Sequence, residues 1–112
     1  MQELIKKIRA FARERDWDQF HSPKNLAMAL SVEVAEIVEH LQWLTQDQSN
    51  RLEADQLDKI RAEIGDVMIY LARLADRLGI DPLQAAHEKM RINEEKYPVA
   101  KARGLATKYT DL

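Results

Sequence analysis

Four carboxylates in the middle of the chain have the spacing of a cation site. Glu33 and Glu36 are three positions apart, and Glu63 and Asp66 repeat that spacing further along. On a helix this spacing places both members of a pair on one face, one turn apart. Four acids gathered in this way would repel one another unless a divalent cation neutralised them. Because the donors are all oxygen, the set predicts Mg²⁺ or Mn²⁺ rather than zinc.

The elements that must position these acids are helices. Apolar residues recur with helical periodicity over most of the chain, and no stretch alternates as a strand would, so we predict an all-α fold. The chain length of 112 residues indicates a single domain spanning 1–112. Helices are expected over Gln2–Arg15, Pro23–Leu44, Asp55–Leu78 and from Pro82 to just before Pro98.

Local signals set the ends of these helices. Ser22 followed by Pro23, and Asp81 followed by Pro82, are typical of an N-cap and a first helical residue. Gly79 is typical of the residue that ends a helix. The residues beyond Pro98 are expected to be irregular.

The polar stretch Thr45–Ala54 predicts a loop that makes the second and third helices antiparallel neighbours. In both helices the carboxylates border the apolar stripe on the same rotational side. With a rise of 1.5 Å per residue, both pairs lie roughly 12–16 Å from the loop. One cation could therefore contact both pairs. The alternative interpretation, solvated surface acids, is the ordinary one for a single pair.

The remaining composition limits the partners. The net charge is −2, which gives no field for nucleic acid or a membrane surface, and there is no cysteine for disulfide or thiol chemistry. No apolar run approaches the ~20 residues of a membrane span. We predict a cytoplasmic protein. Met28, Val32 and Ile69 add a second apolar face to the central helices, which predicts a homo-oligomer.

Aromatic residues and a histidine lie on either side of the second helix. Trp17 and His21 precede it, and Trp43 is near its end. Such groups can stack on a nucleobase and hydrogen-bond its edge. A tryptophan is as commonly interface or core, and His21 could instead cap the turn at Ser22. From these residues alone, both interpretations stay open. His40 and His87 are interpreted as structural or exposed.

Together these segments resemble the all-α nucleoside triphosphate pyrophosphohydrolases called MazG-like. That family has the pattern E-x-x-E, a spacer, then E-x-x-D, as at Glu33-Val-Ala-Glu36 and Glu63-Ile-Gly-Asp66. Further segments are similar to the dCTP-hydrolysing branch of the family: R-D-W-D-Q-F-H-S-P-K-N-L from Arg15, L-Q-W from Leu41, D-V-M-I-Y-L from Asp66, K-M-R-I-N-E-E-K-Y-P from Lys89, and the terminal K-Y-T-D-L.

The resemblance implies a four-helix MazG-like bundle completed by an intertwined dimer, which is commonly paired into a tetramer. It also implies Mg²⁺-dependent hydrolysis of a deoxynucleoside triphosphate, dCTP first, to the monophosphate and pyrophosphate. The four carboxylates would be the metal ligands and catalytic residues. Other matching positions would contact substrate: Trp17, His21, Trp43 and Tyr70 around the base and sugar, and Asn25, Lys89, Asn93 and Tyr97 at the sugar or phosphates.

Two alternatives remain open. A phosphoribosyl-ATP pyrophosphohydrolase shares the helical carboxylate plan, although the aromatic cluster around Trp17 and His21 argues against it. A non-catalytic helical regulator would have no need of all four carboxylates.

Overall fold

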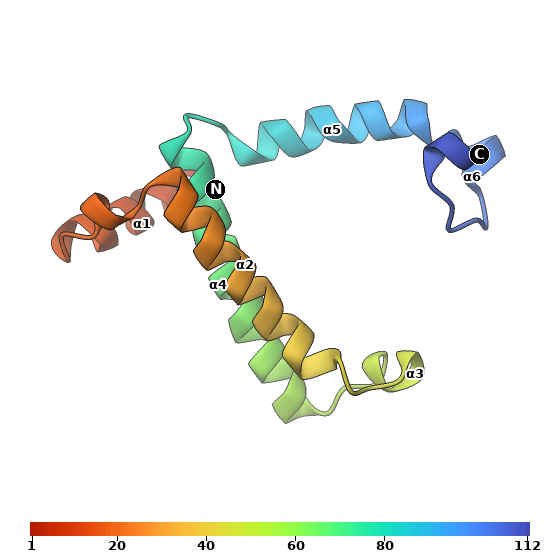
Figure 1. Ribbon diagram of the computed structural model, residues 1–112, viewed down its shortest axis with the longest axis horizontal. Coiled ribbons are helices and arrows are strands. Elements are labelled where there is room, and N and C mark those ends of the chain that lie inside the picture. Colours follow the sequence, from red (N-terminus) through yellow and green to blue (C-terminus); the bar gives the residue numbers. More distant parts are fainter. The chain divides into compact units, whose positions relative to one another are not determined.

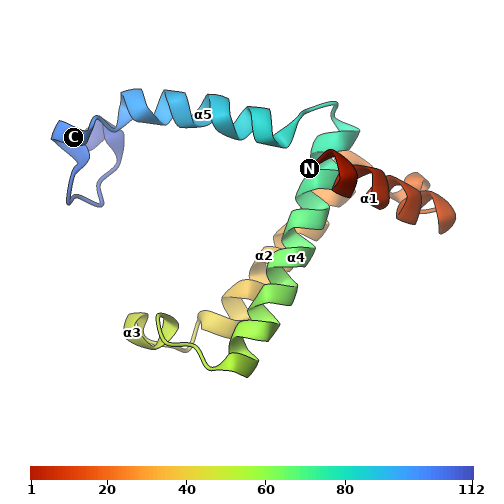
Figure 2. The ribbon, with the colours of Figure 1, turned by 180° about the vertical axis from the view of Figure 1, so that it is seen from behind.

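Two long helices, α2 (Pro23–Leu41) and α4 (Ala54–Arg77), run antiparallel and side by side in the computed structural model, which describes residues 1–112. Figure 1 and Figure 2 show the pair from opposite sides. Every other element is also helical and no strand is present, so the predicted all-α class is confirmed. None of the helices combines the length and apolar character that crossing a membrane requires.

The chain divides into two units, Met1–Gly79 and Ile80–Leu112. The predictions of one domain, and of a four-helix bundle completed by a second copy, therefore stay predictions. The first unit holds α1 (Gln2–Glu14), the 3₁₀ turn η1 (Asp18–Phe20), α2, α3 (Gln46–Ser49) and α4. The second unit holds α5 (Pro82–Lys96), α6 (Val99–Ala102) and the 3₁₀ turn η2 (Tyr109–Asp111).

The helices begin where the cap residues predict. The Ser22 hydroxyl accepts a hydrogen bond from the Asn25 backbone N–H at 3.2 Å, and Asp81 accepts two at the start of α5. Gly79 follows α4 with a φ of 68°, in the left-handed region that glycine adopts without strain.

Three predictions about the local structure were wrong. The second helix ends at Leu41 rather than Leu44. The predicted loop contains α3, because Thr45 and Gln48 form a reciprocal capping box that starts a new helical turn there. The tail after Pro98 was predicted to be irregular but contains α6 and η2.

The core of the first unit is small. Leu26 of α2 and Ile60 of α4 are buried where these helices meet, and full burial of a leucine contributes about 2 kcal/mol. Ala12 and Ala72 are fully buried where α1 packs on α4, because small side chains allow close approach. The apolar stripe that helical periodicity predicts on α4 is only partly buried, since Ile64 keeps 54% of its surface exposed. One neighbouring helix is too narrow to cover it.

Candidate active site

The acidic cluster brings the two predicted carboxylate pairs together. Glu33 and Glu36 project from α2, and Glu63 and Asp66 from α4. Each offers one oxygen, and these four oxygens all lie within 4.8 Å of one another. The antiparallel pairing and the matched distance from the connecting loop produce this arrangement, as the sequence predicts. We use the name acidic cluster for these four residues.

The carboxylates of the acidic cluster repel one another, and two of their oxygens have no hydrogen-bond donor. Glu33 Oε2 and Glu63 Oε2 are buried and have no hydrogen-bond partner. Burial, and then the charge of Glu36, raises the pKa of Glu33. Hydrogen bonding and charge repulsion with Glu63 raise the pKa of Glu36. Buried carboxylate oxygens without donors are costly, so the donor set fits a hard divalent cation.

His40 is the one basic side chain paired with the acidic cluster. Its Nε2 lies 3.6 Å from Glu63 Oε1. The sequence interpretation of His40 as structural or exposed missed this contact. The signal was present, because His40 lies on the same flank of its helix as Glu33 and Glu36.

A tight turn places Trp17 and His21 next to each other. Asp16 adopts a φ of 55°, which aspartate tolerates better than most residues, and Gln19 donates to the Asp16 backbone carbonyl and carboxylate. The η1 turn follows, and the Trp17 and His21 ring centroids lie 6.1 Å apart, edge to face. Trp17 remains 41% exposed, so part of its ring is open to a ligand.

Arg73 contacts His21, a predicted substrate residue, and the sequence interpretation did not include it. It is buried in α4, only 4% exposed, and its Nε donates to His21 Nδ1 at 3.2 Å. Its other nitrogens pair with Asp18 of η1 and, at 3.7 Å, with Asp76 of α4. The sequence did contain a signal for including Arg73. Around the axis of the helix, Arg73 lies about 80° from Glu63, in the direction of Asp66, and therefore on the flank that bears the carboxylates.

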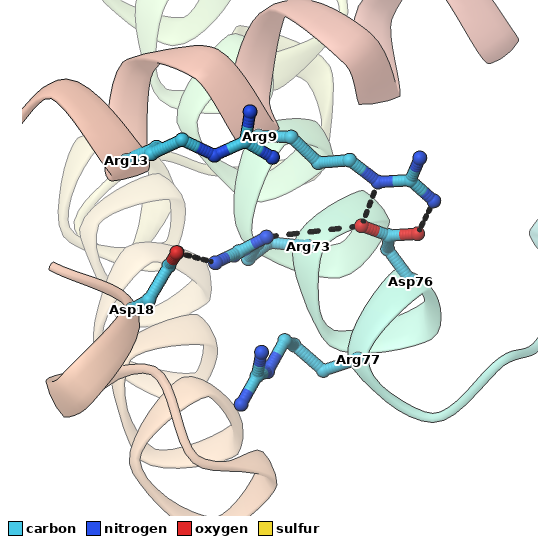
Figure 3. A pocket seen from close by; sticks show the side chains of 6 residues that line it. All are labelled: Arg9, Arg13, Asp18, Arg73, Asp76 and Arg77. Atoms are coloured by element: carbon cyan, nitrogen blue, oxygen red, sulfur yellow. Dashed lines mark hydrogen bonds and ion pairs between the residues drawn. The ribbon is translucent and has the colours of Figure 1, made fainter.

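Asp76 is in turn held by Arg9 of α1, which donates to both carboxylate oxygens. The Arg9 hydrogen bond lowers the pKa of Asp76. Figure 3 shows this chain of contacts at a pocket that Arg13 and Arg77 also line. We use the name arginine network for Arg9, Asp18, Arg73 and Asp76.

The other predicted substrate residues of the first unit are not gathered into one pocket. Asn25 Nδ2 donates to the Phe20 carbonyl at 2.9 Å, which fixes the end of η1. Trp43 follows the end of α2 and is 85% exposed. Tyr70 is half-buried on α4, one turn after Asp66.

The remaining predicted residues belong to the second unit. Lys89 and Asn93 lie on α5, and Tyr97 follows its last residue. The Tyr97 hydroxyl accepts from the Tyr109 backbone N–H at 3.2 Å, and the two rings are 6.0 Å apart. Contact with substrate stays a prediction for these three residues.

Comparisons with known proteins fit this geometry. The MazG-like family matches residues 28–112, a stretch that crosses the boundary between the two units. The chain is 44% identical to mouse dCTP pyrophosphatase 1 and 42% identical to the human protein, over 98% of its own length. It spans 66% of the length of each of these relatives, just under two thirds.

A solved structure is also similar. A pyrophosphatase from Archaeoglobus fulgidus DSM 4304 superposes with a TM-score of 0.83 and 41% sequence identity, covering 88% of this chain and 92% of that one. The identity and the extent of these matches confirm the family that the sequence motifs predict. The chain belongs to the MazG-like family.

Proposed function

We propose that this protein hydrolyses deoxynucleoside triphosphates, dCTP or a related nucleotide first, to the monophosphate and pyrophosphate. The observation that carries the proposal is the acidic cluster, with its four converging oxygens and two buried oxygens that have no partner. The names of the mouse and human relatives, dCTP pyrophosphatase 1, support the substrate. We propose Mg²⁺ as the cofactor, with Mn²⁺ as a substitute.

In this proposal Glu33, Glu36, Glu63 and Asp66 hold the cation. A bound cation would draw negative charge from the phosphate oxygens and acidify a neighbouring water. The water oxygen bonds to the α-phosphorus, and the bond from that phosphorus to the α–β bridging oxygen breaks. Pyrophosphate leaves with the electron pair. The proton that the water loses passes to a carboxylate, for which Glu33 and Glu36 are the candidates.

The nucleoside would be bound near Trp17 and His21 of the first unit. Trp17 offers a partly exposed ring for stacking, beside the half-buried His21. Trp43 and Tyr70 complete the proposed base and sugar contacts. For the sugar and phosphates we propose Asn25, Lys89, Asn93 and Tyr97.

We also propose that the protein works as a homo-oligomer, a dimer or a pair of dimers. In the first unit Met28 is 60% exposed and Val32 is 56% exposed, on the faces of α2 that α4 leaves uncovered. A single copy therefore leaves wide apolar helix faces in water, which is typical of chains that assemble. A second copy of this chain would cover them.

Pyrophosphate release from a panel of nucleotides, with and without Mg²⁺, tests the proposed function. We expect pyrophosphate and dCMP from dCTP only when the cation is present. Phosphoribosyl-ATP as the preferred substrate would support the related enzyme instead. No turnover of any nucleotide with either Mg²⁺ or Mn²⁺ would indicate a non-catalytic regulator and overturn the proposal.

A further inference from the structure

The contact between Arg73 and His21 restricts where the histidine can carry its proton. A guanidinium has only N–H donors and stays charged at any ordinary pH. Because Arg73 Nε donates to His21 Nδ1, at 3.2 Å, that ring nitrogen must present a lone pair. A neutral imidazole with one nitrogen as acceptor carries its hydrogen on the other. His21 then has its N–H at Nε2.

Arg73 cannot easily turn away from this contact. Its side chain is 5% exposed, and its two terminal nitrogens are paired with Asp18 and Asp76. Asp76 is itself clamped by Arg9 from α1. The donor that faces His21 is therefore held from α1, η1 and α4 together (Figure 3).

We propose that Arg73 is a positioning residue that holds His21 as a single neutral tautomer, so that His21 offers the nucleobase a hydrogen-bond donor and never an acceptor. This inference rests on the proposed function for its consequence, the choice of base. Cytosine presents an unprotonated ring nitrogen at N3, whereas thymine and uracil carry N3–H there. A fixed N–H at His21 can donate a hydrogen bond to N3 of cytosine. Opposite thymine or uracil the same N–H would face another donor, the N3–H.

The charges around His21 favour the neutral ring. Burial lowers its pKa first, and the cationic Arg73 and Arg77 lower it further, against an opposing effect of Asp18. The Trp17 ring also lies against His21, with the two ring centroids 6.1 Å apart. A neutral histidine with one occupied acceptor satisfies the buried arginine. A protonated ring would instead place two donors face to face.

The direct test is nitrogen NMR of the wild-type protein with ¹⁵N-labelled histidine, without substrate. Imidazole nitrogen shifts distinguish protonated from unprotonated ring nitrogens. We expect one neutral tautomer for His21 at neutral pH, with the hydrogen on the nitrogen remote from Arg73. His87, on the exposed side of α5, is the internal reference for exchange between tautomers. A mixture of tautomers, or a doubly protonated ring, at His21 would overturn the inference.

The functional test uses Arg73→Gln, whose amide can donate or accept and so no longer fixes the ring. We expect the ratio of kcat/KM for dCTP over dTTP to fall by about tenfold, largely through a gain on dTTP. Arg73→Lys keeps a side chain that can only donate, so this variant should retain the wild-type preference for dCTP over dTTP. Arg13→Gln changes another arginine of the pocket that Arg73 lines, and it should leave the ratio unchanged because the hydrogen bond to His21 comes from Arg73.

The outcomes separate this inference from the proposed function. An equal loss on dCTP and dTTP in Arg73→Gln would show a merely structural arginine and overturn the inference while the activity stands. If Arg73→Gln does not fold, the wild-type spectrum and Arg73→Lys decide. A wild-type protein with a single His21 tautomer but no pyrophosphate release would overturn the proposed function. The assignment of the His21 tautomer would then still stand.

Discussion

The α2–α4 pair and the segments packed on it carry two polar clusters that are built in opposite ways. In the arginine network every carboxylate faces a guanidinium, and the buried Arg73 has a partner at each of its three nitrogens. In the acidic cluster four carboxylates face one another, and two buried oxygens have no partner. The first cluster is complete within the chain, and the second is not.

This difference distinguishes a cluster that stabilises the fold, the arginine network, from a cluster suited to bind a ligand, the acidic cluster. A closed set of ion pairs fixes the elements that bear it, here α1, η1 and α4. An open set of like charges raises the free energy of the folded chain until something of opposite charge binds. The fold retains the acidic cluster although it is destabilising, which is typical of a functional site.

The largest effect is expected from Glu63→Gln, which removes one charge from the acidic cluster without changing its shape. We expect kcat/KM for dCTP to fall by about 10³-fold, because loss of a cation ligand forfeits several kcal/mol of transition-state stabilisation. Initial rates of pyrophosphate release measure this. Glu3→Gln, which neutralises an exposed glutamate of α1 outside the acidic cluster, is the control and should retain its rate. Full activity in Glu63→Gln would remove the proposed site.

Arg73→Leu breaks the closed cluster at its buried centre. The variant leaves Asp18 and Asp76 without their common partner, so we expect the free energy of unfolding to fall by about 3 kcal/mol. Urea denaturation followed by circular dichroism measures this loss. An unchanged midpoint would show that the arginine network contributes no stability, and the contrast between the two clusters would disappear.

Asp76→Asn should lower the free energy of unfolding by less, about 1–2 kcal/mol at neutral pH, because water can still solvate the Arg9 guanidinium after the change. The cost depends on pH with a definite sign. Arg9 lowers the pKa of Asp76 below the ordinary aspartate value of 3.8. Its stabilisation is therefore complete above that value and is lost as the pH falls through the folded-state pKa. Wild type and variant should converge in acid, and a constant difference down to low pH would contradict this assignment.

The smallest effect has the opposite sign. Without any divalent cation, Glu63→Gln should be more stable than wild type by about 1 kcal/mol, because one orphaned charge becomes a neutral donor. The melting temperature in chelator should rise by about 4 °C. Excess Mg²⁺ should reverse the order, since only wild type gains from binding. A variant less stable in chelator would show that Glu63 is not in a repulsive site.

Features governed by neighbours in sequence were predictable. Ser22 and Asp81 start their helices because an N-cap acts on backbone groups only two or three residues away. The acidic cluster followed from helical periodicity and one short connection. Both depend on geometry that repeats along the chain.

Contacts between distant residues were not predictable. Arg73 reaches His21 across 52 positions and Asp18 across 55, and no local pattern specifies such partners. The end of α2 was missed because the capping box at Thr45 competes with continued helical periodicity. Burial of the α4 stripe was overestimated because periodicity shows which face is apolar, and not how wide a neighbour covers it.

The most direct test of the central claim, that the acidic cluster is a cation site, is a titration of the nucleotide-free protein with Mn²⁺ monitored by electron paramagnetic resonance. We predict saturable binding in wild type that excess Mg²⁺ displaces, weakened binding in Glu63→Gln, and unchanged binding in Glu3→Gln and Arg73→Lys. Mn²⁺ that stays free in the presence of wild-type protein, or that binds equally well to Glu63→Gln, would contradict the account.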